Sequence, residues 1–236
     1  MITRLSNQDK TNSVTNTGQP LKLVIAVAIV VTLTACGDTA DKIIDNTETN
    51  RSTNVSYINA LDDNTTFFLQ SDIYSASVYE SQFKIIELMS VEVSEEIQHD
   101  WINGANESVF AIENAITNGS RVSQEIGVNE YSKYWAVAWN NTDGNMLTVF
   151  EKKVNDKADM YSVRLLAASA MTVKDSFSNE SLATTEPGVV TASFEVSGCS
   201  DLVVGDNEID LCTIGMVGHS YLVVVSVDGQ TVVSQE

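Results

Sequence analysis

The chain has 236 residues, of which 32 are acidic and 13 are basic, and its formal net charge is −19 at pH 7. This balance excludes nucleic acid as a partner, because binding to phosphates requires clustered Lys and Arg. It also excludes recognition of anionic lipid headgroups, which requires polybasic patches. The length allows one or two domains with a hydrophobic core.

Residues 1–35 have the pattern of an export signal. Basic residues precede an apolar run from Leu23 to Leu33, and small residues follow before a cysteine. The apolar run is shorter than the ~20 residues that a transmembrane helix needs. It ends in Leu33, Thr34, Ala35 and Cys36. These four residues resemble the box at which bacterial lipoproteins are cleaved and lipidated.

The resemblance implies that residues 1–35 are removed and that Cys36 carries acyl chains. Because two or more acyl chains hold a protein stably on a membrane, we expect a membrane-anchored protein of the bacterial cell envelope. Gly37 after the cysteine fits outer-membrane sorting in enteric bacteria. Two other interpretations stay open, namely a plain signal peptide that contains a cysteine and a buried helix. Cleavage removes three basic residues and one acidic residue, which gives a formal charge of −21.

Residues 36–53 comprise the lipidated cysteine and a polar segment rich in Asp, Asn and Thr. Such a composition predicts a flexible tether with a typical end-to-end distance of ~20–25 Å. The tether would hold the folded part clear of the membrane surface.

Beyond the tether, short β-rich runs alternate with turn residues, which predicts a mainly β fold. Asp143-Gly144 and Asp228-Gly229 lie between such runs and predict hairpin turns in which both central positions favour positive φ. Residues 107–117 are ambiguous, because their apolar spacing equally fits a short helix. The predicted strands are 55–61, 65–70, 83–93, 133–140, 146–152, 161–168, 189–196, 220–227 and 230–234.

A weak internal repeat relates the two halves of this region. The matching segments are 55–60 with 163–168 and 134–138 with 221–225. In each half, the second segment leads into an Asp-Gly pair. The repeat predicts two units of similar design, residues 54–154 and residues 159–236.

The opening strand Val55–Ala60 resembles that of a family of uncharacterised bacterial immunoglobulin-like β-sandwich modules, which occur singly or in tandem behind export signals. The resemblance implies two tandem antiparallel β-sandwich units of immunoglobulin type. The second unit departs from the pattern, because Ala167 stands where the first unit has Asn59. The family has no established chemistry, so no functional residues follow from it.

With Cys36 assigned to lipid, Cys199 and Cys212 are left as a pair in an oxidising compartment. A two-residue turn at Gly205-Asp206, of type II′, places the two cysteines opposite each other at a non-hydrogen-bonded pair. Their Cα atoms would be ~4.5 Å apart, which is within the range for a disulfide. We therefore predict a cross-strand disulfide.

The same register sorts the neighbouring side chains by face. The face directed to the core would hold Leu202, Val204, Ile209 and Leu211. The other face brings Asp201 opposite Asp210, with Glu208 nearby. Three interpretations stay open: a bound cation such as Ca²⁺, which oxygen ligands suit, a solvated edge, or a different register. No other cofactor is expected.

Catalytic patterns are nearly absent from the sequence. His99 and His219 are far apart and lack zinc-type spacing, and no nucleophile elbow, phosphate loop or dinucleotide fingerprint is present. We therefore expect no enzymatic activity. A hydrolase would require one of these histidines to meet a carboxylate and a nucleophile in one pocket.

Five aromatic residues are candidates for a sugar-binding surface, since aromatic faces stack on ligands. They are Trp101, Tyr131, Tyr134, Trp135 and Trp139. Trp135 and Trp139 lie on one face of a predicted strand, which favours a core role. The expected function is a non-enzymatic structural, adhesive or partner-binding surface toward an envelope or extracellular protein or a glycan. The alternative is a small-ligand or glycan-binding lipoprotein, with or without calcium.

Overall fold

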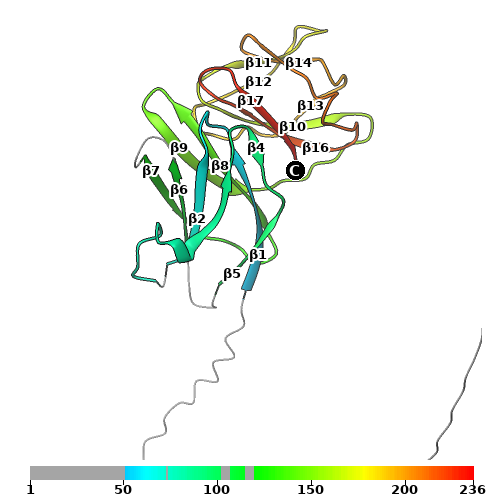
Figure 1. Cartoon of the computed structure of the whole chain (residues 1–236). Coiled ribbons are helices and arrows are strands. Elements are labelled where there is room, and N and C mark those ends of the chain that lie inside the picture. Colours follow the sequence, from blue (N-terminus) through cyan, green and yellow to red (C-terminus); the bar gives the residue numbers. More distant parts are fainter. Residues whose placement is uncertain (1–50, 73, 102–106, 115–119) are drawn as a thin grey trace, which may run out of the picture. The chain divides into compact units, whose positions relative to one another are not determined.

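The structure is a computed structural model that describes residues 51–72, 74–101, 107–114 and 120–236. The described chain is mainly β, with four open sheets and no α-helix among these residues (Figure 1). The predicted lipidation box and the tether up to residue 50 lie outside the described residues. The last three residues of the predicted tether, 51–53, belong instead to the first strand.

The first half of the described chain forms two sheets that share one hydrophobic core. Its elements are β1 (Arg51–Asn59), β2 (Thr65–Ser71), the 3₁₀ turn η1 (Ser81–Phe83), β3 (Lys84–Leu88), β4 (Glu92–Val93), β5 (Ile97–Trp101), β6 (Ser108–Asn114), β7 (Arg121–Ile126), β8 (Lys133–Asn141) and β9 (Gly144–Glu151). One sheet has the order β4-β1-β8-β9, with β5 also paired to β1, and the other has the order β3-β2-β6-β7. Val55, Phe67 and Ile112 are among the core residues that both sheets contribute.

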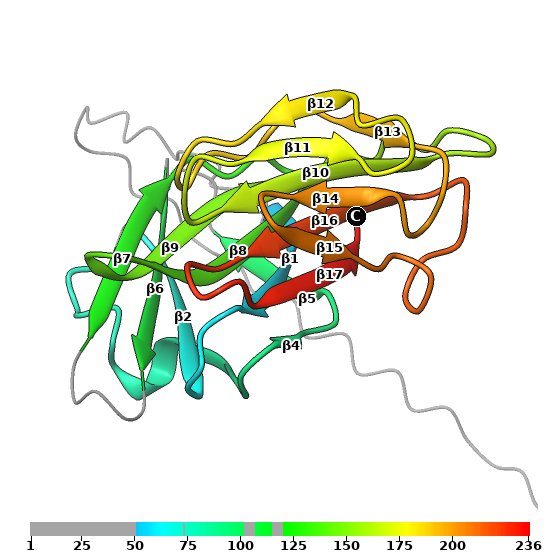
Figure 2. The ribbon, with the colours of Figure 1, turned by 90° about the horizontal axis from the view of Figure 1, so that it is seen from above.

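The second half forms two further sheets around a core of their own (Figure 2). Its strands are β10 (Tyr161–Ala167), β11 (Thr172–Asp175), β12 (Ser181–Thr184), β13 (Phe194–Val196), β14 (Leu202–Val204), β15 (Asn207–Ile209), β16 (Ser220–Val225) and β17 (Thr231–Gln235). The sheet orders are β13-β10-β16-β17 and β12-β11-β14-β15. Two pairs of facing sheets are consistent with β-sandwiches.

The predicted internal repeat is confirmed by the strand topology. Within each half, the first strand lies parallel to the second-last strand, which forms a hairpin with the last. Val55 is paired with Tyr134 in the first half, and Val163 is paired with Tyr221 in the second. The residues matched by sequence therefore occupy the same register positions.

We call the sheets β4-β1-β8-β9 and β13-β10-β16-β17 the two inner sheets. Their central strands, β1 with β8 and β10 with β16, are buried on both faces. On β8, Tyr134 faces the core of its own sheet pair, whereas Trp135 and Trp139 belong to a third cluster together with Leu166 and Leu222 of the second half. The expected core role of the two tryptophans is therefore confirmed. The described residues belong to one compact unit, and the boundaries 54–154 and 159–236 stay predictions of separate domains.

A close backbone approach accompanies this third cluster. A Cβ atom on Gly188 would lie 2.8 Å from Trp139 Cζ2, and Gly188 has φ of +71°. Only glycine combines this conformation with that lack of space. The Gly188 N–H donates to the Ala167 carbonyl at 3.0 Å, which holds the loop on the edge of β10.

One fold prediction was wrong, and one alternative that the sequence left open is decided by the structure. The inner sheets are not purely antiparallel, because β1 with β8 and β10 with β16 form parallel pairs. The helix allowed at 107–117 is strand β6 over Ser108–Asn114, and residues 115–117 lie outside the described residues. β6 lies between β2 and β7 and buries side chains on both faces, so its apolar residues do not alternate as those of a half-buried strand do.

Both predicted hairpins form, but their turns differ from the expected ones. Asn141 is paired with Gly144, so the two loop residues are Thr142 and Asp143, and Asp143 does not have positive φ. The Asn141 side chain accepts hydrogen bonds from the amides of Asp143 and Gly144 at 2.8 and 3.1 Å. In the second hairpin, Gly229 alone has positive φ, +84°, which is typical of a longer loop with glycine in the left-handed position.

Candidate functional site

A tyrosine fixes the loop that precedes the central strand in each half. The amide of Asn129 donates to Tyr134 Oη at 2.9 Å, and the amide of Met216 donates to Tyr221 Oη at 2.7 Å. In both cases the donor lies five residues before the tyrosine. The loops before β8 and β16 are therefore equivalent, and each is tied to the core by a buried ring.

The loop before β16 presents three apolar side chains to solvent. Ile214, Met216 and Val217 are 55, 67 and 49% exposed, and we call residues 213–219 the apolar loop. Tyr221 Oη donates in return to the Met216 carbonyl at 2.9 Å. The amide of Gly218 donates to the Met160 carbonyl at 2.9 Å. These bonds hold the loop backbone in place while its apolar side chains stay in water.

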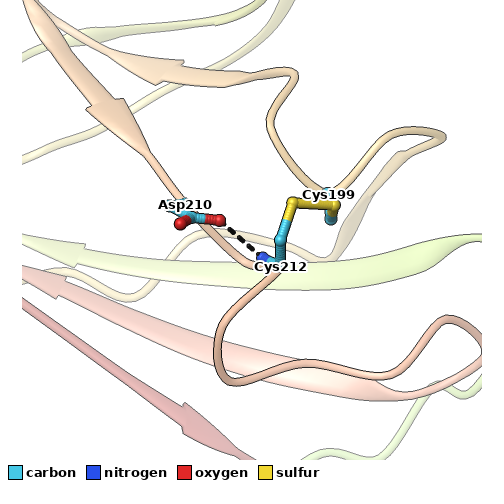
Figure 3. The surroundings of a disulfide bond; sticks show 3 residues. All are labelled: Cys199, Asp210 and Cys212. Carbon is cyan, nitrogen blue, oxygen red and sulfur yellow. Dashed lines mark hydrogen bonds between the residues drawn. A yellow bond between two sulfur atoms is a disulfide. The ribbon is translucent and has the colours of Figure 1, made fainter.

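The predicted disulfide between Cys199 and Cys212 is present immediately before the apolar loop (Figure 3), with Cα atoms 4.9 Å apart. The register expected from the turn is confirmed, because Leu202 is paired with Ile209 and Val204 with Asn207. Gly205 has φ of +61° and Asp206 does not have positive φ, as a type II′ turn requires. The four residues expected on the core face, Leu202, Val204, Ile209 and Leu211, are all fully or almost fully buried.

The acidic residues of this hairpin are not brought together as a metal site. Strand pairing ends at Leu202 and Ile209, so Asp201 and Asp210 fall just beyond the ladder. Asp210 Oδ1 accepts a hydrogen bond from the Cys212 amide at 2.7 Å (Figure 3). Among the described residues, no group of three or more His, Cys, Asp or Glu side chains is placed to hold a metal ion. Asp201, Glu208 and Asp210, the candidate ligands under the calcium interpretation, therefore do not form such a group.

His99 and Trp101 meet at a small cavity of about 200 Å³ at the edge of the first sheet pair. The two rings stack with centroids 5.7 Å apart, and His99 Nε2 lies 3.3 Å from Ser108 Oγ. Burial lowers the pKa of His99 to about 4, so the imidazole is neutral at pH 7. Ser108 is fully buried and does not line the cavity, so its hydroxyl lacks the access that a nucleophile needs.

His219 lies elsewhere, at the end of the apolar loop. Its Nδ1 atom is 3.6 Å from Asp156 Oδ2 and 3.4 Å from Gln235 Nε2. The two histidines of the chain are therefore in different places, as their sequence separation predicts.

A larger groove of about 860 Å³ runs along residues 150–155 and 190–193, with Arg164 in its wall. The Arg164 and Glu236 side chains are 6 and 1% exposed and form an ion pair at 3.5 Å. Glu236 Oε2 also accepts hydrogen bonds from Trp135 Nε1 at 3.0 Å and from the Lys153 amide at 3.1 Å. Burial lowers the pKa of Arg164, and the Glu236 carboxylate opposes this shift. Both residues of the pair belong to the second half, and their hydrogen bonds to Trp135, Glu151 and Lys153 connect it to the first half.

Of the five aromatic candidates for a sugar-binding surface, only Tyr131 is exposed. Its side chain is 86% exposed, whereas the other four residues are 1–4% exposed. The structure thus places Tyr134, Trp135 and Trp139 in hydrophobic cores, whereas Trp101 is buried beside His99 at the small cavity. Sequence reasoning missed the apolar loop, although apolar residues flanked by Gly215 and Gly218 outside any predicted strand were a usable signal.

Neither the protein-family models nor the curated proteins contain a match to this chain. No helix among the described residues is long and apolar enough to cross a membrane.

Proposed function

We propose that this chain is a lipid-anchored protein of the bacterial cell envelope that binds a protein partner and performs no catalysis. The lipobox Leu33–Cys36 and the polar segment after it support the anchor and the tether. Facing sheets and the tyrosine-tied loops support the finer proposal of immunoglobulin-like sandwich units, because a tyrosine that bonds back to nearby backbone is typical of such folds. We propose the outer membrane as the location.

The exposed apolar side chains of the apolar loop are the observation that supports a partner-binding role. The loop gathers three exposed apolar side chains within four residues, and exposed apolar patches mark interaction sites. The disulfide at Cys212 and the hydrogen bonds to Met216 and Gly218 fix the loop before any partner arrives. A prearranged loop loses little conformational entropy on binding, which favours affinity.

A photo-crosslinking amino acid at position 216 tests this role in intact cells. We expect a discrete adduct of higher mass, and the same adduct should disappear when Ile214→Ser and Val217→Ser are added, because the apolar contact is lost. The control places the crosslinker at Met89, which is exposed to a similar degree in the other half of the chain. Identical adducts from both positions, or none from position 216 in cells that display the protein, would contradict the proposal.

A further inference from the structure

Tyr131 occupies a backbone position at which the fold requires a left-handed residue. It lies three residues before Tyr134, as Gly218 lies three residues before Tyr221. The φ angles are +66° for Tyr131 and +96° for Gly218. Their amides donate to equivalent acceptors, the Ser52 carbonyl at 3.3 Å and the Met160 carbonyl at 2.9 Å. The two halves of the chain therefore form the same turn, with a tyrosine at this position in the first half and a glycine in the second.

Glycine is the low-energy solution at such a position, because a Cβ atom makes positive φ unfavourable. The tyrosine ring brings no compensating burial, since the side chain is 86% exposed. Folding alone therefore does not explain a tyrosine here. A strained residue with an exposed aromatic ring points to a function for the ring.

A polar cavity of about 250 Å³ lies directly beside Tyr131. Its other lining residues are Ser52, Thr53, Asn54, Gln98, Ser132 and Lys133. The side-chain amides of Asn54 and Gln98 supply both hydrogen-bond donors and acceptors. Lys133 is paired with Glu96 at 2.9 Å, which offsets its charge. The cavity thus combines neutral hydrogen-bonding groups with an exposed aromatic face.

We propose that Tyr131 and this cavity bind a neutral hexopyranose unit of an oligosaccharide. The tyrosine ring would stack on the apolar face of the sugar, while the Asn54 and Gln98 amides bond its hydroxyls. The cavity is smaller than the ~300–1,000 Å³ of sites for drug-sized ligands, so it takes one sugar unit of a longer chain. The net charge of −19 disfavours uronic acids. This site shares no residue with the apolar loop. The sugar-binding proposal therefore does not depend on the proposed protein partner.

The test titrates the full chain, in a detergent without a sugar headgroup, with maltotetraose, cellotetraose, a chitin tetramer and tetragalacturonic acid. We expect at least one neutral tetrasaccharide to bind and the uronate to bind more weakly. Tyr131→Ala should lower the affinity about tenfold, and Tyr131→Phe should retain it, because the ring face makes the contact. Phe177→Ala is the matched control, since Phe177 is 92% exposed elsewhere.

A second variant separates binding from folding. Tyr131→Gly should lose the sugar and raise the thermal midpoint, because it removes the backbone strain and no buried contact. A lower midpoint for Tyr131→Gly would assign the ring a structural role and overturn the proposal. Unchanged affinity in Tyr131→Ala, preference for the uronate, or no binding of any neutral probe by the folded chain would overturn it as well.

Discussion

Replacing Arg164 by alanine is expected to lower the free energy of unfolding by about 3–5 kcal/mol, because it leaves the Glu236 carboxylate buried without its counter-charge. The Glu236 side chain is 1% exposed and contacts residues of both halves. The same substitution also removes the Arg164 hydrogen bond to the Glu151 carbonyl at 3.1 Å. Urea unfolding followed by tryptophan fluorescence measures the loss, since Trp135 lies against this pair.

Lys157→Ala is the matched control for Arg164→Ala. Lys157 pairs with Glu195 but its side chain is 54% exposed, and exposed ion pairs contribute ~0–1 kcal/mol. The double variant Arg164→Met with Glu236→Gln should be more stable than Arg164→Ala, because it removes both charges of the pair and leaves neither of them buried without its partner. A loss below about 1 kcal/mol in Arg164→Ala would show that the pair does not hold the two halves together.

Removing the disulfide by Cys199→Ser with Cys212→Ser is expected to cost about 3 kcal/mol in the chain-entropy model, given the 13-residue separation. The loss should appear as a lower urea midpoint. Because the bond immediately precedes the apolar loop, proteolysis within residues 213–219 should also become faster.

Wild-type protein in reductant serves as the comparison for the double serine variant, since both lack the bond. A variant as stable as oxidised wild type would contradict a stabilising role. A variant less stable than reduced wild type would instead trace the additional loss to the serine side chains.

Local sequence patterns predicted most strands, because β-rich runs and the turn residues between them can be recognised within a few neighbouring residues. The Cys199–Cys212 register followed from one glycine turn, since a hairpin register depends only on its turn. The internal repeat was visible because Val55 and Val163, and likewise Tyr134 and Tyr221, keep the same register in each half. Strand β6 was ambiguous because both its faces are buried.

The long-range features had no local signal. Parallel pairing of β1 with β8 joins residues 79 positions apart, and no turn fixes such a register. The burial of Arg164 with Glu236 depends on the packing of the two inner sheets. The strain at Tyr131 became visible only when the structure placed it at the position of Gly218. The candidate binding residues on the loops before β8 and β16 could therefore be recognised only from the fold.

In the proposed function, Cys36 anchors the protein to the cell envelope through acyl chains. Metabolic labelling with an alkyne palmitate analogue, followed by membrane fractionation, tests it with the wild type and Cys36→Ser side by side. We expect a labelled wild type in the membrane fraction and an unlabelled, uncleaved Cys36→Ser variant, because processing at the box requires the lipidated cysteine. A wild type that carries no label would contradict the lipid anchor.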